Sequence, residues 1–174
     1  MAERIGIYTG PDLAQIADPE PAQRAMNRMA TTGGDRMHAM IAELTPVDTG
    51  NLATSWTRMP TRYEMHGPER AWVSRVRTEV DYAPYVEHGT GLWGPEHRKY
   101  LIVPKKPGGF LSWVDPRTGR RVFARQVWHP GSPGAHMVSR GVALVHGLLR
   151  EIMDPELERF KREQEAVMEA ARVR

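Results

Sequence analysis

The sequence predicts an α+β fold in which an antiparallel sheet packs against a long N-terminal helix and C-terminal helices. Three observations predict this class. Apolar residues recur at helical spacing over residues 26–44, apolar and polar residues alternate over residues 71–80, and turns rich in proline and glycine divide residues 100–134 into short segments. Strands that are grouped together between helices are typical of α+β proteins.

The first predicted helix begins near Asp18 and ends before Pro46. Asp18 is a favourable N-cap, and Pro19 suits the first helical position because it has no backbone N–H to leave unpaired. Gly33 and Gly34 each weaken the helix by about 1 kcal/mol relative to alanine, so they predict a kink or a close helix crossing. Pro46 disfavours helical conformation in the residue before it. The methionines on the apolar stripe are interpreted as core residues.

Five strands are predicted in the middle of the chain. They form a strand pair and a three-strand meander, at residues 61–66 and 71–80 and then at 100–104, 110–114 and 120–128. Tight turns containing proline and glycine separate the strands of the meander, which is why neighbouring strands are expected to pair.

Two helices follow, the first over residues 135–153 and the second capped by Asp154 and Pro155. In the last helix a short heptad seam steps by threes and fours through Leu157, Phe160, Gln164, Val167 and Ala171. Two heptads do not form a stable isolated coiled coil, so the seam must dock on its own domain or on a neighbouring subunit. We therefore predict a single α+β domain over residues 1–153 and a helical extension over residues 154–174.

Composition narrows the functional classes. The chain has no cysteine, which excludes disulfides, thiolate metal ligands and a cysteine nucleophile. It has no apolar run long enough to span a membrane and no basic start followed by an apolar segment, so we expect neither a membrane span nor a secretory signal.

Charge is segregated along the sequence. Residues 98–125 carry eight basic residues against one acid, Asp115, whereas the first fifty and the last twenty-four residues each carry more acid than base. Such segregation suits an anionic partner or self-association through unlike patches. The alternative is a solvated hairpin with lysine and arginine on its outer face.

Residues 80–91 (VDYAPYVEHGTG) crowd acids, phenols and an imidazole into a short segment. One hypothesis is a hydrolase built on Asp81, Glu87 and His88. However, no serine lies in a Gly-x-Ser-x-Gly sequence, and six residues of irregular chain do not determine the separation of Asp81 and Glu87. The alternative is a structural corner, in which Tyr82 and Tyr85 are anchors with a buried ring and a polar tip, and Glu87 and His88 form a hydrogen-bonded corner or a subunit contact.

Metal and phosphate sites have no clear signature. His88 and His97 are nine residues apart and His129 and His136 are seven apart, and neither spacing matches a common zinc pattern. The glycine-containing stretches HGTG and KPGG fit no phosphate-binding loop and are better explained as turns. The sequence therefore predicts no cofactor and no metal.

A second functional hypothesis is nucleic-acid binding through residues 98–125. Phe110, Trp113, Phe123 and Trp128 lie among the basic residues, as in a groove that stacks bases. No RNP-like, helix-turn-helix or zinc-finger signature is present, and the aromatic residues also alternate as core residues would. This hypothesis describes a stand-alone protein that contacts the nucleic-acid backbone without sequence preference.

Three blocks of sequence, in order, resemble one known family. They are residues 46–55 (PVDTGNLATS), residues 82–90 (YAPYVEHGT), and residues 102–131, which contain IVPK, GGFL and HPG. This order is similar to that of the head–tail joining, or tail-completion, minor tail proteins of long-tailed phages. The family commonly has a Pro-Phe pair after its HPG loop, where this chain has Ala135-His136-Met137, and the last helix lies beyond the resemblance.

The resemblance implies a non-enzymatic structural protein of the virion neck or tail, assembled in the cytoplasm of a bacterial host. It implies a homo-oligomeric ring between head and tail around the DNA path, with neighbouring neck and tail proteins as partners, a nonspecific DNA contact and no membrane. The implied assembly surface comprises Asp48, Thr49, Gly50, Tyr82, Tyr85, Glu87, Gly89, Thr90, His129, Pro130 and Gly131. The basic residues that would face DNA or a neighbouring subunit are Lys105, Lys106, Arg117, Arg120, Arg121 and Arg125.

Overall fold

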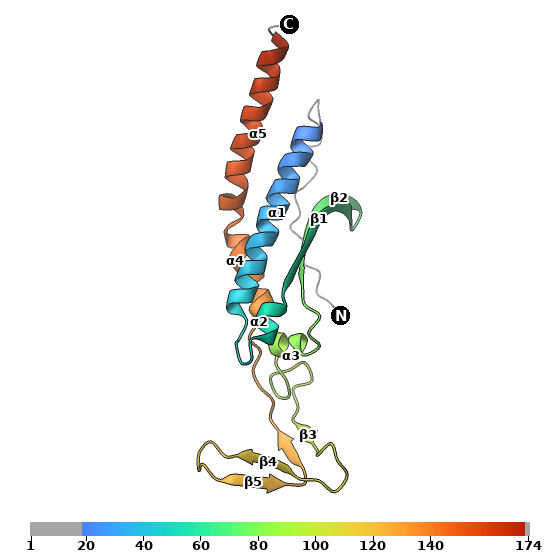
Figure 1. Cartoon of the computed structure of the whole chain (residues 1–174). Helices are drawn as coiled ribbons and strands as arrows, with labels where there is room; N and C mark the ends of the chain where they lie inside the picture. The colour runs from blue at the N-terminus through green and yellow to red at the C-terminus, as the bar shows by residue number, and fades with distance from the viewer. Residues whose placement is uncertain (1–18, 173–174) are drawn as a thin grey trace. The chain divides into compact units, whose positions relative to one another are not determined.

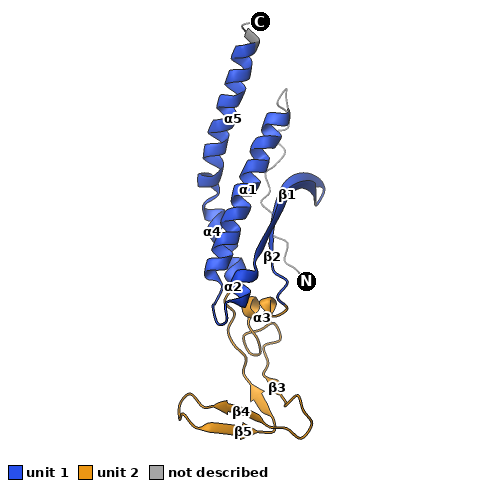
Figure 2. Ribbon diagram, viewed as in Figure 1, with its two compact units in different colours: residues 1–80, 137–174 blue, residues 81–136 orange. Residues whose placement is uncertain are grey.

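The structure, a computed structural model, describes residues 19–172, so the predicted N-cap Asp18 lies outside the described residues (Figure 1). The predicted α+β class is confirmed, with a long N-terminal helix, small antiparallel sheets and C-terminal helices. The chain divides into two compact units, residues 1–80 with 137–174 and residues 81–136 (Figure 2).

The first unit is built around α1. Its elements are α1 (Pro19–Leu44), α2 (Asn51–Ser55), β1 (Thr57–His66), β2 (Glu69–Arg77), α4 (Met137–Gly147) and α5 (Leu149–Arg172). β1 and β2 form the predicted antiparallel pair, with an irregularity in the register between Met59 and Arg62. α1 contacts both of these strands as well as α4 and α5, so one helix holds the unit together.

The core of this unit confirms that the methionine stripe is structural. One cluster contains Ala22, Ala25, Met29 and Phe160, with Met153 and Leu157 packed against it. A second cluster contains Met37, Ile41, Val145 and Ile152. Leu157 and Phe160 belong to the predicted heptad seam, so this part of the seam docks on α1 of its own chain.

Two glycines permit the close packing of α1. A Cβ atom on Gly34 would overlap the side chain of Ser74 on β2, so this glycine lets the helix approach a strand. A Cβ on Gly141 of α4 would lie 2.8 Å from the Ile41 side chain. α1 itself continues through Gly33 and Gly34. The glycine pair therefore marks a close approach of helix to strand, whereas the sequence predicted a kink or a helix–helix crossing.

The predicted break between the last two helices is displaced. α4 ends at Gly147 and α5 begins at Leu149, whereas the sequence predicted a break at Asp154. Pro155 lies inside α5, where the loss of one N–H donor is offset by the burial of Ile152 and the packing of Leu157. The status of residues 154–174 as a separate extension stays a prediction.

The second unit consists of a short helix and a bent hairpin. Its elements are α3 (Ala83–His88), β3 (Tyr100–Ile102), β4 (Leu111–Val114), β5 (Arg121–Ala124) and β6 (Val127–His129). β3 pairs with β6 and β4 pairs with β5, both antiparallel. We call residues 100–129 the hairpin arm.

The predicted three-strand meander is therefore wrong. In a meander β3 would pair with β4, but in the structure the β4–β5 hairpin is nested inside the β3–β6 ladder. Residues 103–110 form an eight-residue connection rather than a tight turn, so β4 does not fold back onto β3. The tight turn begins at Asp115. Its amide donates a hydrogen bond to the Arg120 carbonyl at 2.9 Å, and its carbonyl accepts one from the Gly119 amide at 2.8 Å.

Candidate assembly surface

Residues 80–91 fold into a short helix followed by a glycine turn. Tyr82 is the N-cap of α3, Pro84 lies in the first turn, and the helix ends at Gly89, whose φ is 79°. The amide of Tyr85 donates to the Tyr82 carbonyl at 3.0 Å, and the amide of Gly89 donates to the Tyr85 carbonyl at 3.0 Å. The predicted crowded segment is thus one helical turn and a half with a reversal after it.

The inner face of α3 is formed by Ala83 and Glu87, which are 6% and 3% exposed. These residues are four apart and therefore lie on the same side of the helix. Tyr82 and Tyr85 lie outside this face, 42% and 64% exposed. The interpretation of the two tyrosines as anchors with buried rings is therefore wrong within a single chain, because a six-residue helix buries only one narrow face.

The predicted hydrolase residues do not share one environment. Glu87 is buried, whereas Asp81 and His88 are exposed.

The glycine turn after α3 pairs with the HPG loop. The amide of Thr90 donates to the Ser132 carbonyl at 2.9 Å, and the amide of Leu92 donates to the Pro130 carbonyl at 2.7 Å. On the other side, the amide of Ala135 donates to the carbonyl of Val86 at 2.8 Å. Backbone hydrogen bonds thus join the second sequence block to the HPG loop at the end of the third. The two partners Thr90 and Ser132 lie 42 residues apart in the chain.

Glycine is required where these two segments meet. A Cβ on Gly91 would overlap the carbonyl of Pro130, and a Cβ on Gly131 would overlap the carbonyl of Thr90. Both glycines also have positive φ, 63° and 91°. Backbone atoms are the obstacles here, so no side-chain movement can relieve the overlap. Gly89 is crowded in the same way by the backbone at Gly134 and Ser132.

His129 has a structural role at the end of β6. Its Nδ1 atom accepts a hydrogen bond from the amide of Gly131 at 2.9 Å, which places the remaining ring proton on Nε2. Its ring lies 5.4 Å from the ring of Tyr100, its partner across the β3–β6 ladder. The imidazole thus shapes the HPG loop, which explains why a histidine precedes Pro130 and Gly131.

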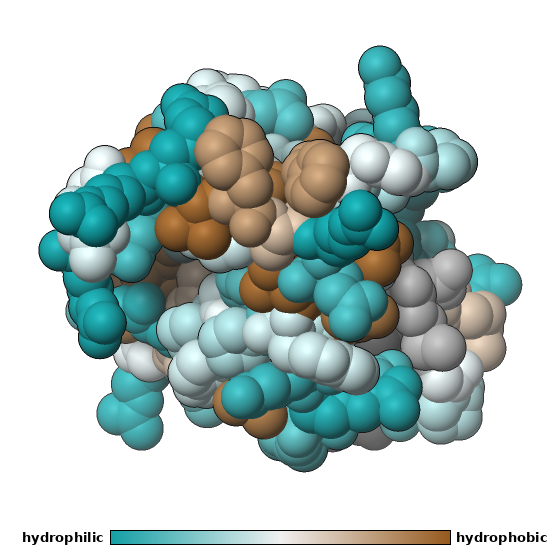
Figure 3. All heavy atoms as spheres, turned by 90° about the horizontal axis from the view of Figure 1, so that it is seen from below, coloured by the Kyte–Doolittle hydropathy of each residue, from teal (hydrophilic) through white to brown (hydrophobic). Residues whose placement is uncertain are grey.

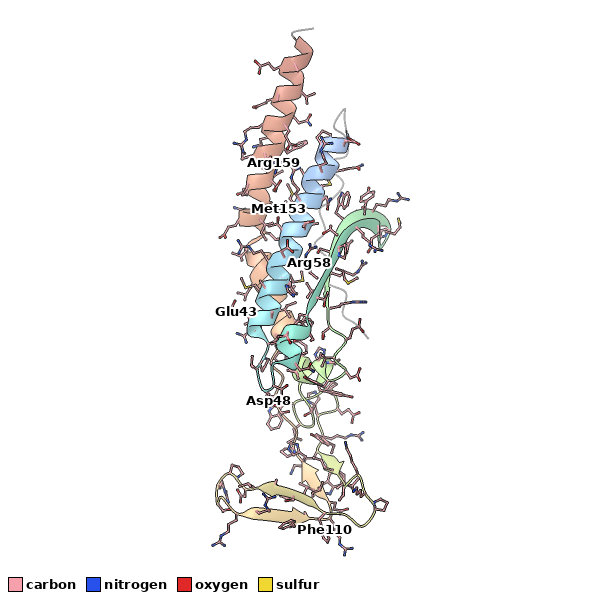
Figure 4. All side chains as sticks on the ribbon, in the orientation of Figure 1. Glu43, Asp48, Arg58, Phe110, Met153 and Arg159 are labelled. Carbon is pink, nitrogen blue, oxygen red and sulfur yellow. The ribbon has the colours of Figure 1, made fainter. Side chains whose placement is uncertain are left out.

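The first sequence block lies in the other unit and comprises the loop after α1 and the short helix α2. Asp48 and Thr49 are exposed there, and Asp48 is labelled in Figure 4. Gly50 is the N-cap of α2 with a φ of 82°, and its carbonyl accepts the amide and the hydroxyl of Thr54 at 3.1 and 2.9 Å. Glycine occupies the capping position, so no side chain caps this helix.

A hydrogen-bonded chain anchors the same block, and sequence reasoning missed it. The indole N–H of Trp56 donates to the Thr45 hydroxyl at 2.9 Å, and that hydroxyl donates to the Ile41 carbonyl at 2.6 Å. Nε2 of His38 lies 2.9 Å from the carbonyl oxygen of Trp56. A threonine directly before Pro46 at a helix end was the available signal, because its hydroxyl can satisfy an unpaired terminal carbonyl.

The hairpin arm contributes nothing to the buried core. Among residues 100–129, all of which the structure describes, none is a buried hydrophobic residue. Phe110, Phe123 and Trp128 are 59%, 64% and 62% exposed, and Phe110 is labelled on the arm in Figure 4. The six candidate basic residues of the arm are also exposed. The aromatic residues that alternate along the strands are therefore surface residues, not core residues.

Figure 3 views the molecule from the side on which β4 and β5 lie in Figure 1. Apolar residues, in brown, lie at the surface among hydrophilic residues in teal. Within the described part of the chain, no group of three or more histidine, aspartate or glutamate residues is placed to hold a metal ion. No helix among those residues has the length and apolar character needed to cross a membrane.

Backbone hydrogen bonds and close glycine contacts hold the signature residues around Thr90 and Gly131, while Asp48, Tyr82 and Tyr85 are exposed. Comparison with family models found a match. Residues 12–89 match HK97-gp10_like, described as "Bacteriophage HK97-gp10, putative tail-component".

This match covers the first sequence block and the second up to Gly89, and it confirms the predicted resemblance to a phage tail family. It spans less than half of the chain. The comparisons with curated proteins and with solved structures found no match.

Proposed function

We propose that this protein is a non-enzymatic structural component that joins the phage head to the tail. In this proposal several copies form a ring in the neck or at the end of the tail, around the path of the DNA. The family match over residues 12–89 supports the tail assignment. The observation that carries the joining role is the hairpin arm, because an isolated two-stranded hairpin with no core is marginal until a partner covers it.

The experiment is deletion of the gene from the phage. We expect full heads and finished tails that fail to join, visible by electron microscopy, and loss of infectivity. The wild-type gene supplied in trans should restore infectious particles. A chain in which a short Gly-Ser turn replaces residues 103–126 should not restore them. Normal infectious particles after deletion would overturn the proposal.

Replacement of one residue, His88, distinguishes the structural hypothesis from the enzyme hypothesis. His88 is exposed, and as part of a structural surface its replacement by alanine should leave the fold unchanged. The variant His88→Ala should complement the deleted phage, or fail only in the joining of heads and tails. A hydrolytic activity of the purified chain that this substitution abolishes would favour the enzyme hypothesis.

A second candidate function is stand-alone nucleic-acid binding. The observation that favours it is the exposure of Lys105, Lys106, Arg117, Arg120, Arg121 and Arg125 on one arm. Binding to duplex DNA should then weaken steeply with salt and weaken further in Arg120→Ala with Arg121→Ala, because each basic contact releases counterions. No measurable binding at low salt would remove this candidate.

A further inference from the structure

One face of the hairpin arm is both aromatic and basic. Ser112 pairs with Phe123 and Val114 pairs with Arg121 across the β4–β5 ladder. Residues at alternate positions of a strand share a face, and partners across a ladder do so as well. This arginine–phenylalanine face therefore contains Phe110, Ser112, Val114, Arg121, Phe123 and Arg125.

This face is exposed although it carries large apolar side chains. Phe110, Val114 and Phe123 are 59%, 54% and 64% exposed, whereas Val122 and Ala124 on the opposite face are half-buried. In a hairpin with one solvent-exposed face, phenylalanines normally lie on the opposite, more buried face. A contiguous apolar patch on a monomer surface marks an interaction site.

The arginines of this face are held in place by their neighbours. The guanidinium carbon of Arg125 lies 5.6 Å from the centre of the Phe110 ring, and Nη1 of Arg121 donates to the Ser112 hydroxyl at 3.1 Å. A guanidinium that stacks on a ring keeps N–H donors at its edge available for a carboxylate or a phosphate. The face therefore suits a partner that is acidic and apolar at the same time.

Duplex DNA fits only half of this description. Its phosphates would satisfy the arginines, but its bases are stacked inside the helix and offer nothing to Phe110, Val114 and Phe123. An amphipathic helix with glutamates beside apolar residues satisfies both the charge and the apolar side chains.

The C-terminal part of α5 has this composition. Residues 164–170, here called the α5 tip, contain Glu165 and Glu169 and neither lysine nor arginine. Val167 and Met168 of the tip are 60% and 59% exposed. The C-terminal end of a helix is also the negative end of its dipole, which favours arginine.

The rest of α5 is already engaged within the chain. Phe160 packs against Ala22 and Ala25 of α1, and Val167 lies about two turns further along α5. Glu158 accepts a hydrogen bond from Lys161 at 2.7 Å, and this bond lowers the pKa of the glutamate and raises that of the lysine. Glu163 lies 3.6 Å from Arg28 and 3.1 Å from Arg159. The acidic and apolar part that extends beyond these contacts is the tip.

We propose that the arginine–phenylalanine face of one copy docks onto the α5 tip of a second copy. The inference rests on the proposed function, since it specifies the contact between copies in the ring. The contact joins two different surfaces, so every copy uses its arm on one neighbour and its tip on the other, and repetition of this heterologous contact builds a ring or an open chain of copies.

Disulfide trapping tests the contact directly, because the chain has no cysteine and any cross-link must join introduced residues. Phe123→Cys on one chain and Met168→Cys on a second chain, marked by a size tag, are mixed at high concentration and oxidised. We expect the mixed disulfide in excess of random pairing. A chain that carries both substitutions should give a ladder of linked copies on a denaturing gel.

The matched control pair is Thr118→Cys with Glu43→Cys, two exposed positions that lie outside both surfaces. It should give no more mixed product than random pairing. Equal yields for the two pairs, or no cross-link for Phe123→Cys with Met168→Cys, would overturn the proposal.

Charge reversal gives an independent test. Arg121→Glu with Arg125→Glu in the cysteine-bearing arm should lower the cross-linked yield about tenfold, because like charges then face each other. Glu165→Arg with Glu169→Arg in the partner chain should restore it. Failure of the restoring pair, together with loss of duplex DNA binding in the arm variant, would assign the face to DNA instead.

The failure of this contact and the failure of the proposed function give different results. If the deleted phage makes unjoined heads and tails but the cross-link does not form, copies meet through another surface and the joining role stands. If the deletion leaves infectious particles, the joining role fails whatever the cross-link shows.

Discussion

The first unit and the hairpin arm use aromatic residues in opposite ways. In the first unit, Phe160 is 8% exposed and packs against α1 in a helical core. In the arm, Phe123 is 64% exposed and lies across the ladder from Ser112. The contrast shows that one chain contains a part that folds around its own core and a part whose large apolar residues are left exposed.

The largest expected change in stability comes from replacing these two phenylalanines one at a time. Phe160→Ala should lower the free energy of unfolding by about 3–5 kcal/mol, since it leaves a cavity between α5 and α1. Phe123→Ala removes the same atoms from an exposed site and should change it by less than about 0.5 kcal/mol. Urea unfolding of the two variants measures both values, and equal losses would show that the arm is part of the folded core.

The second-largest effect is expected where the glycine turn after α3 meets the HPG loop; we call this contact the joint. Gly131→Ala should destabilise this joint by about 3 kcal/mol, because a Cβ would overlap the Thr90 carbonyl at a positive φ. Hydrogen exchange at the amides of Thr90 and Leu92 should become faster. Gly119→Ala is the control, as its Cβ meets nothing within 4 Å; it should cost about 1 kcal/mol and leave those two amides protected.

The helix–strand contact in the first unit comes third. Gly34→Ala should cost about 2 kcal/mol, since the overlap with Ser74 outweighs the better helix propensity of alanine. Gly147→Ala has open space around its Cβ and should leave the thermal midpoint unchanged or slightly higher. Recovery of stability when Ser74→Gly is added to Gly34→Ala would confirm that this contact is the cause.

The smallest expected effect compares two ion pairs. Arg28 of α1 lies 2.5 Å from Glu156 and 3.6 Å from Glu163 of α5, and its side chain is 25% exposed. Arg28→Ala should cost about 1 kcal/mol, with a loss that shrinks at high salt. Arg98, 2.6 Å from Glu96, is 75% exposed, so Arg98→Ala should be neutral in the same denaturation series.

Local patterns predicted the first unit well. The spacing of Met29, Met37 and Ile41 places them on one helix face, and the structure buries all three. The alternation over residues 71–80 predicted β2, which pairs with β1 as expected. These predictions succeeded because helix and strand periodicity are set by backbone geometry, which any buried face must obey.

Pairing over longer distances could not be predicted in the same way. The segments 100–104 and 110–114 were expected to be neighbours, but Tyr100 pairs with His129 and Leu111 pairs with Ala124. The choice between a meander and nested hairpins depends on whether the connection at residues 103–110 turns back, and its prolines and glycines are compatible with both. Helix α5 shows the same limit, since packing carries it through Pro155.

The candidate site likewise has features that the sequence predicted and features that depend on the folded structure. The amino-acid sequence by itself determined the α+β class, the resemblance of its signature blocks to a phage tail family and the charge of residues 98–125. Only the tertiary structure decided that Thr90 pairs with Ser132, that Glu87 is buried while Tyr85 is exposed, and that Phe123 lies across the ladder from Ser112. Composition and periodicity are local properties of a chain, whereas burial depends on which distant segment lies opposite, and that is known only once the chain has folded.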